Sequence, residues 1–123
     1  HNCRIDDTIV ADGCTLDGCQ VTNSVIGIRS QVQEGTTIRR SVILGADYYD
    51  SDQARPSSDA PRLGIGRHAE LDGVIVDKNA RIGDRVRLVN AQRLKEFDGE
   101  GYYIRDGIII VPKDGTIPAG TVI

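Results

Sequence analysis

The sequence contains no tryptophan and no methionine, and only five of its 123 residues are aromatic. An ordinary globular core uses more large aromatic side chains. This core must therefore be built from isoleucine, valine and leucine, which favour strands. The two histidines, His1 and His68, are too few for a histidine-based metal site. The three cysteines lack the CxxC spacing of zinc and thioredoxin-type sites.

Other absences narrow the class of protein further. There is no run of 18 apolar residues, so no membrane span is expected, and there is no signal peptide. A net charge of -3 argues against a general nucleic-acid binder. The segment Gly64–Ala69 has the letters of a dinucleotide fingerprint, but no helix is expected after it, so that interpretation is rejected. The chain begins with His1 instead of methionine, and we expect it to be cut from a longer protein at that end.

What the sequence does contain is a large aliphatic residue at every fifth or sixth position. Neither the 3.6-residue period of a helix nor the two-residue period of a half-buried strand fits this spacing. A very short strand followed by a tight turn does fit, and three such units close one triangular coil that stacks on the next. We call these aliphatic residues the anchors: Ile5, Val10, Leu16, Val21, Ile26, Val32, Ile38, Ile43, Ile65, Leu71, Val76, Ile82, Leu88, Val111, Ile117 and Ile123.

The anchors predict an all-β fold, a parallel β-helix of hexapeptide repeats, over the single domain 1–123. Anchors three steps apart are separated by 16 or 17 residues, which is the predicted length of one coil. A small residue lies two positions before almost every anchor and is expected to point inward near a corner. Cys3, Cys14 and Cys19 occupy this position, so we expect them to be buried, reduced thiols.

Two insertions, about 44–64 and 89–110, interrupt the repeat. The second contains "NAQRLKEF", which we interpret as a short helical turn. All five aromatic residues lie in these insertions. They are expected either to pack over one flank of the coil or, at Tyr48-Tyr49 and Tyr102-Tyr103, to meet a partner surface.

Charge is unevenly distributed along the chain. Residues 62–95 carry a net charge of +4, whereas the remainder carries -7. The basic stretch is either a solvated outer face with scattered ion pairs or a site for a small phosphorylated anion, which Arg and Lys bind through charge-assisted hydrogen bonds.

Four segments resemble the C-terminal domain of ADP-glucose pyrophosphorylase, also called glucose-1-phosphate adenylyltransferase. They are "SVIGIRS", "SVILGADYYDSD", "GIGRHAELDGVIVDKNARIGD" and "GIIIVPKDGTIPAGTVI". The resemblance covers nearly the whole chain, is strongest to the plant and cyanobacterial branch, and implies the left-handed form of the β-helix. In that family a large N-terminal domain makes ADP-glucose and pyrophosphate from ATP and glucose 1-phosphate, for glycogen or starch synthesis. The C-terminal β-helix contributes to tetramer assembly and allosteric control.

The resemblance also implies specific roles for residues of this chain. Two activator-contacting lysines carry over by motif: Lys78 in "DKNARIG" and Lys113 in "VPKDGTIPAG". Arg81 and Arg105 are further candidate anion contacts. No catalytic residue, metal or cofactor is expected here, because the nucleotide loop, the catalytic residues and their Mg²⁺ belong to the N-terminal domain.

The implied partners are that catalytic domain, the other subunits of a homo- or heterotetramer, and a phosphorylated effector such as 3-phosphoglycerate or inorganic phosphate. No nucleic acid and no membrane are expected as partners. The implied location is the bacterial cytoplasm, or the plastid if the source is a plant.

Two alternatives from other classes stay open. A hexapeptide-repeat acyltransferase would need a catalytic histidine in a cleft between β-helices, and His68, the only internal candidate, is predicted to face outward in a turn. The other alternative is a purely structural β-helix module. Binding of acetyl-CoA would favour the first, and binding of phosphoglycerate would favour the regulatory domain.

Overall fold

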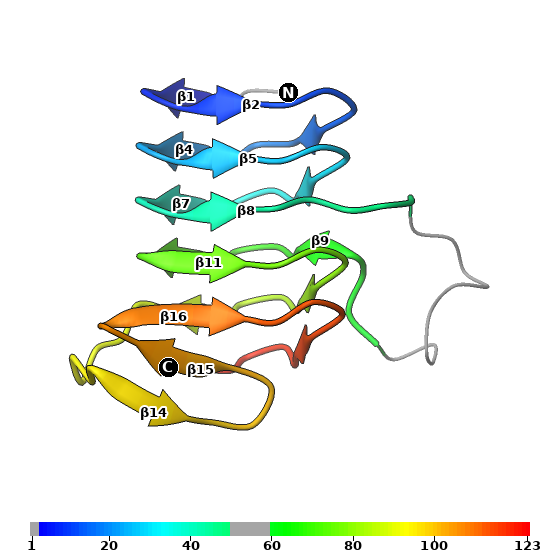
Figure 1. Ribbon diagram of the computed structural model, residues 1–123. Coiled ribbons are helices and arrows are strands. Elements are labelled where there is room, and N and C mark those ends of the chain that lie inside the picture. Colours follow the sequence, from blue (N-terminus) through cyan, green and yellow to red (C-terminus); the bar gives the residue numbers. More distant parts are fainter. Residues whose placement is uncertain (1–2, 50–59) are drawn as a thin grey trace.

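The computed structural model describes residues 3–49 and 60–123, and in this part of the chain every regular element is a β-strand. The strands are two to four residues long and wind into a stack of triangular coils, with one sheet on each side (Figure 1). Apart from β14 and β15, strands that are neighbours in a sheet belong to successive coils, so their pairing along the stack is parallel.

The three sheets have the following order. The first sheet contains β1 (Arg4–Asp6), β4 (Gln20–Thr22), β7 (Thr37–Arg39), β10 (Glu70–Asp72) and β13 (Arg87–Leu88). The second contains β2 (Ile9–Val10), β5 (Val25–Ile26), β8 (Val42–Ile43), β11 (Val74–Val76), β16 (Ile108–Val111), β15 (Tyr103–Arg105) and β14 (Glu96–Asp98). The third contains β3 (Thr15–Leu16), β6 (Gln31–Val32), β9 (Gly64–Ile65), β12 (Arg81–Ile82) and β17 (Thr116–Ile117).

The anchors form the core, as the repeat predicts. In the first sheet Ile5 is paired with Val21, and Val21 with Ile38, so each anchor stacks on the anchor one coil away. Val21 and Ile38 are fully buried. Ile5 and Val10 remain 40% and 37% exposed because they lie in the first described coil, with no coil above them.

The small residues two positions before the anchors also point inward. Thr36 and Ser41 are buried, and their hydroxyls donate to the carbonyls of Gly66 and Arg39 at 2.6 and 2.7 Å, so the hydroxyls are satisfied inside the core. Cys3, Cys14 and Cys19 all lie in the described part of the chain, and no disulfide joins them. Only Cys19 is fully buried, because Cys3 and Cys14 belong to the first coil, where they are half-buried.

The first insertion is shorter than the predicted 44–64. The backbone N–H of Leu44 donates to Val76 at 2.8 Å and that of Ala46 donates to Ile28 at 2.9 Å, so the coil continues through Ala46. Leu63 is buried again just before β9. The residues that leave the coil therefore lie between these two, and 50–59 are outside the described residues.

The helical turn predicted in the second insertion is wrong. Residues 90–93 form one tight turn, in which the Arg93 N–H donates to the Asn90 carbonyl at 2.9 Å. The Asn90 side chain amide then bonds the backbone of Leu94 and Gly107, which fixes the turn against the next segment. The following residues form an antiparallel meander, β14-β15-β16, that returns the chain to the second sheet. The ring centroids of Phe97 and Tyr102 lie 6.1 Å apart on this meander.

Candidate functional site

The corner that follows the second sheet brings Lys78 and Lys113 together. Val76 of β11 is paired with Val111 of β16, and each lysine comes two residues after its valine. The backbone continues in register around the corner, because the Asp114 N–H donates to the Lys78 carbonyl at 2.9 Å. The two lysines therefore occupy the same position on adjacent coils, although 35 residues separate them in sequence. We call this corner, with Asp47 and Asn79, the lysine corner.

Local sequence explains the shape of the turn that carries Lys78. The Asp77 carboxylate accepts a hydrogen bond from the Lys78 N–H at 2.7 Å and so satisfies that backbone donor within the turn. Asn79 has a φ of +62°, which asparagine tolerates better than most residues. Its side chain is buried, with 6% of the residue exposed, so the turn is fixed from inside.

Asp47 supplies a carboxylate to the lysine corner. Its Oδ1 lies 3.3 Å from Lys78 Nζ, and its Oδ2 accepts a hydrogen bond from Asn79 Nδ2 at 3.1 Å. The backbone N–H of Asp47 donates to Asn79 Oδ1 at 2.8 Å. The pKa of Asp47 is lowered, first by the hydrogen bond from Asn79 and then by the one from Lys78, with Lys113 adding a through-space effect. Sequence reasoning missed Asp47, because only the stacking of the coils places it beside residues that are 31 and 32 positions away.

The net charge of the corner is not positive. Against Lys78 and Lys113 stand Asp47 and the two aspartates next to the lysines, Asp77 and Asp114. An anion held there must therefore displace an internal carboxylate or be met by cations from a neighbouring surface.

The other two candidate anion contacts, Arg81 and Arg105, have partners of their own. Arg81 is 5% exposed, and its guanidinium donates to the Pro61 carbonyl at 3.1 Å. Arg105, on β15, donates to the Asp98 carboxylate at 2.6 Å and stacks over the Tyr103 ring at 5.2 Å. Each guanidinium is thus engaged by other described residues.

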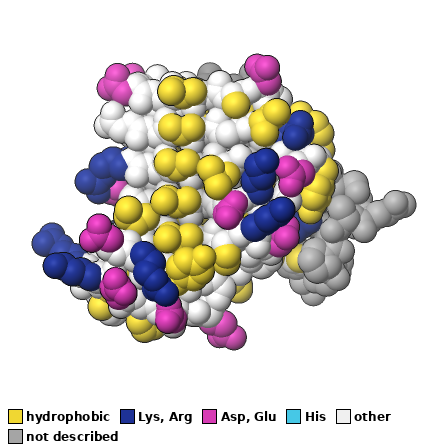
Figure 2. Space-filling view, in the orientation of Figure 1, with side chains coloured by type: hydrophobic (Ala, Val, Ile, Leu, Met, Phe, Trp, Pro, Cys, Tyr) yellow, Lys and Arg dark blue, Asp and Glu magenta, His cyan; other side chains and the backbone are white. Residues whose placement is uncertain are grey.

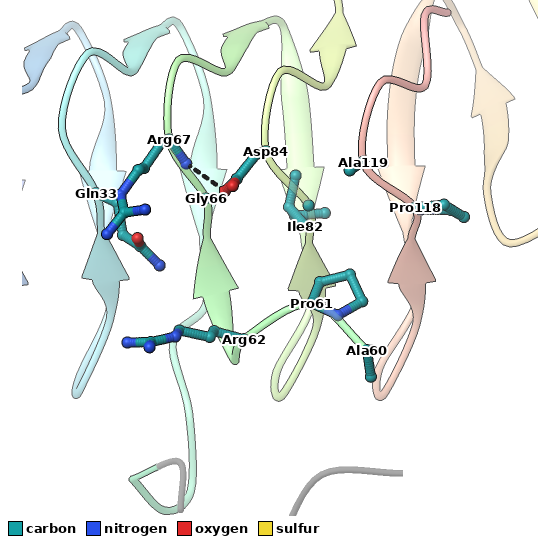
Figure 3. Close-up of a pocket in the computed structure, with 11 residues that line it drawn as sticks. Gln33, Ala60, Pro61, Arg62, Gly66, Arg67, Ile82, Asp84, Pro118 and Ala119 are labelled. Carbon is teal, nitrogen blue, oxygen red and sulfur yellow. Dashed lines mark hydrogen bonds between the residues drawn. The ribbon is translucent and has the colours of Figure 1, made fainter. Parts of the chain in front are cut away.

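A hollow of about 300 Å³ lies beside the third sheet (Figure 3). Arg62 and Arg67 line one part of it, and Pro61, Pro118 and Ala119 another. Asp84, the one carboxylate among the described lining residues, accepts a hydrogen bond from the Arg67 N–H at 2.9 Å. The described lining residues include no histidine, cysteine, serine or lysine, so among them only Asp84 could serve as a general base. His68 is not among them and lies exposed in a turn, as the sequence predicted.

The outward faces of the first and second sheets differ in chemistry. The second sheet presents an apolar row, one residue per coil, which is visible as a vertical yellow stripe in Figure 2. We call it the apolar row, and it consists of Ile9, Val25, Val42, Ile75 and Ile110 in successive register. Ile9 is 70% exposed and Val25 is 40% exposed.

The first sheet instead carries a charged network on its outward face. Arg39 bonds both Glu70 and Asp72, and Arg87 bonds Glu70 at 3.0 Å. The pKa of Glu70 is lowered, chiefly by its hydrogen bond from Arg39. The first sheet is therefore suited to water, whereas the exposed apolar row of the second sheet is typical of an interaction surface.

Within 3–49 and 60–123, no group of three or more His, Cys, Asp or Glu side chains is arranged to hold a metal ion. In the same ranges, no helix has the length and apolar character needed to cross a membrane.

Comparison with known proteins agrees with the fold. A family model described as the GLGC left-handed parallel beta-helix domain matches residues 1–122. This confirms the left-handed parallel β-helix predicted from the sequence. A glucose-1-phosphate adenylyltransferase small subunit from Zea mays is 38% identical over 125 residues, which cover 97% of this chain and 100% of that sequence.

Proposed function

Because the chain belongs to the GLGC left-handed β-helix family, as the C-terminal domain of ADP-glucose pyrophosphorylase, we propose that it regulates and assembles a glucose-1-phosphate adenylyltransferase. The enzyme would make ADP-glucose and pyrophosphate from ATP and glucose 1-phosphate, for glycogen or starch. Catalysis and its Mg²⁺ would belong to a separate N-terminal domain. We place the enzyme in the bacterial cytoplasm, or in the plastid if the source is a plant.

The lysine corner carries the regulatory part of the proposal. Lys78 and Lys113 match the motif lysines that contact the activator in this family, and they lie on adjacent coils at one corner. Two ammonium groups on one corner can bind one phosphate through charge-assisted hydrogen bonds, each worth roughly 1.5–3 kcal/mol. The proposed ligands are 3-phosphoglycerate as activator and inorganic phosphate as inhibitor.

The apolar row supports the assembly part of the proposal. Five outward aliphatic residues in register would lose unfavourable contact with water if a partner covered them. The relative from maize is named a small subunit, so an enzyme of several subunits is the natural setting for such a face. We propose that the row contacts the catalytic domain or another subunit of a tetramer.

The acyltransferase alternative has less support. It needs a catalytic histidine, and His68 is exposed at a turn and is not part of the hollow beside the third sheet. A purely structural module would not require two lysines at one corner.

Activation curves of the complete enzyme test the regulatory proposal. Lys113→Ala should raise the 3-phosphoglycerate concentration needed for half-activation by about ten-fold or more, since one charge-assisted contact is lost. Lys78→Ala should act in the same direction. Lys95→Ala is the matched control, because Lys95 is an exposed lysine outside the corner.

Two outcomes would count against the proposal. An unchanged activator response in both corner variants would remove the site from these lysines. A collapse of unactivated turnover would indicate structural damage instead of lost effector binding.

A further inference from the structure

The carboxylate at the lysine corner belongs to the protein itself. Asp47 comes directly after Ala46, the last buried residue before the chain leaves the coil. Two hydrogen bonds with the Asn79 side chain hold it, one through its backbone N–H and one through Oδ2. Its Oδ1 faces Lys78 Nζ at 3.3 Å. The carboxylate is therefore aimed at the same ammonium group that the proposed effector needs.

We infer that Asp47 is a built-in counter-anion that occupies the effector's place at Lys78 and sets the affinity of the lysine corner for phosphorylated ligands. This inference rests on the proposed function, because it assigns a further residue to that same site. The effector would bind only when its phosphate replaces the Asp47 carboxylate at Lys78. Asp47 would then act as a competitor that is always present.

Two observations support a competing role. The first is position: the tether to Asn79 presents the carboxylate at a fixed place, so its local concentration at Lys78 is high. The second is charge: Asp47 also interacts electrostatically with Lys113, since both lysines lower the pKa of Asp47. Two adjacent ammonium groups repel each other, and Asp47 relieves that repulsion when no ligand is bound.

The expected size of the effect follows from the exposure of the pair. The side chains of Lys78 and Asp47 are 43% and 45% exposed, so their contact belongs to the weak, surface class. In an ion pair of that class, Lys78 is paired with Asp47 in only a part of the molecules. A competing anion binds Lys78 only in the unpaired molecules, which would lower its apparent affinity by about 2- to 6-fold. Removing the Asp47 charge should therefore tighten phosphate binding by about that factor.

A positioning role for Asp47 would change phosphate affinity in the opposite direction. If Asp47 instead positioned the Lys78 ammonium to receive the effector, its loss would weaken binding. A single affinity measurement therefore separates a competitor from a positioning residue.

The experiment is a ³¹P NMR titration of the purified protein with inorganic phosphate at pH 8 and low ionic strength. Asp47→Asn removes the charge and keeps the shape of the side chain. Asp114→Asn is the matched control, because it removes an equal charge from the next coil at a position with a φ of +61° that asparagine accepts. Asn79→Gly keeps the Asp47 charge but removes its tether. Lys113→Ala tests the site itself.

The expected result is tighter binding in Asp47→Asn by about 2- to 6-fold, a smaller gain in Asp114→Asn, and a gain of intermediate size in Asn79→Gly. Equal affinity in wild type and Asp47→Asn, or weaker binding in Asp47→Asn, would overturn the inference. So would equal gains in Asp47→Asn and Asp114→Asn, because these would reflect net charge alone.

The Lys113→Ala arm separates the inference from the proposed function. If Lys113→Ala binds phosphate as wild type does, or if no protein in the series binds it, the proposed site is wrong and the inference falls with it. If Lys113→Ala weakens binding while Asp47→Asn changes nothing, only the role of Asp47 is wrong.

Discussion

The stacked core predicts that one substitution has very different costs at two positions in the same column. Ile38 and Ile5 are both anchors of the first sheet, separated by Val21. Ile38 is fully buried between coils, whereas Ile5 is 40% exposed at the end of the stack. Substitution by alanine removes the same three carbon atoms at each site, so only the surroundings differ.

The magnitudes follow from burial. At Ile38 the lost transfer free energy is about 2.4 kcal/mol, at about 0.8 kcal/mol per carbon. The cavity left between two fixed coils adds to it, so Ile38→Ala should lower the free energy of unfolding by about 3–4 kcal/mol. At Ile5 part of the side chain already contacts water and no described coil covers it, so Ile5→Ala should cost about 1 kcal/mol.

Urea unfolding followed by circular dichroism measures the difference. With a slope of about 1–3 kcal/mol per molar urea, Ile38→Ala should unfold at a midpoint about 0.7–3 M lower than Ile5→Ala. Wild type provides the reference for both variants. Equal midpoints for the two variants would refute the assignment of Ile38 to a continuous core column.

Four further predictions concern the thiols, the charged network and catalysis. Cys19 should react with a thiol reagent far more slowly than Cys3 and Cys14 in the native protein, and all three should react at similar rates after denaturation. Burial, helped by the hydrogen bond with Cys3, raises the pKa of Cys19 from 9.0 to about 12. The Cys19 thiol therefore contributes to stability below pH 9, and this contribution is lost as the pH rises toward 12. The stability of Cys19→Ala should lack this alkaline decline. The pKa of Glu70 is lowered instead, so the Glu70 carboxylate contributes to stability above pH 4.5, its ordinary pKa, and this contribution is lost as the pH falls below that value. Glu70→Gln should therefore lose less stability than wild type as the pH falls. The purified 123-residue protein should make no ADP-glucose in a coupled assay, and measurable synthesis would contradict the separation of regulation from catalysis.

The repeat architecture could be predicted from the sequence because a single physical requirement recurs at every coil. Each short strand must place one aliphatic side chain inside, and Val21, Ile38 and Ile82 satisfy this with almost no exposure. The same periodicity places Lys78 and Lys113 at equivalent corner positions, since each follows its anchor by two residues. The position of a residue within the repeat thus predicts its place in the coil.

The meander after the fourth coil could not be derived from that periodicity. Its strands β14 and β15 hold no hexapeptide anchors and are stabilised by antiparallel pairing with β16. A usable signal was present: Asp106-Gly107 joins β15 to β16, and their φ values of 53° and 79° are the conformation that a tight hairpin turn requires. The "NAQRLKEF" segment was misread because its helix-forming residues are outweighed by the side chain bonds of Asn90.

The contact of Asp47 with Lys78 was also beyond sequence reasoning. Asp47 lies at the start of an insertion, where the repeat assigns no position to a side chain. Only the register of the coils shows that a carboxylate and an ammonium group 31 residues apart lie at one corner.

Lysine footprinting tests most directly whether the lysine corner holds the effector. The chain has only three lysines, Lys78, Lys95 and Lys113, so Lys95 serves as an internal control in the same sample. Acylation rates are measured by mass spectrometry with and without 3-phosphoglycerate. We predict that the effector slows acylation of Lys78 and Lys113 several-fold and leaves Lys95 unchanged, because a bound phosphate engages both corner ammonium groups. Unchanged rates at Lys78 and Lys113, or equal slowing at all three lysines, would contradict a phosphate site at this corner.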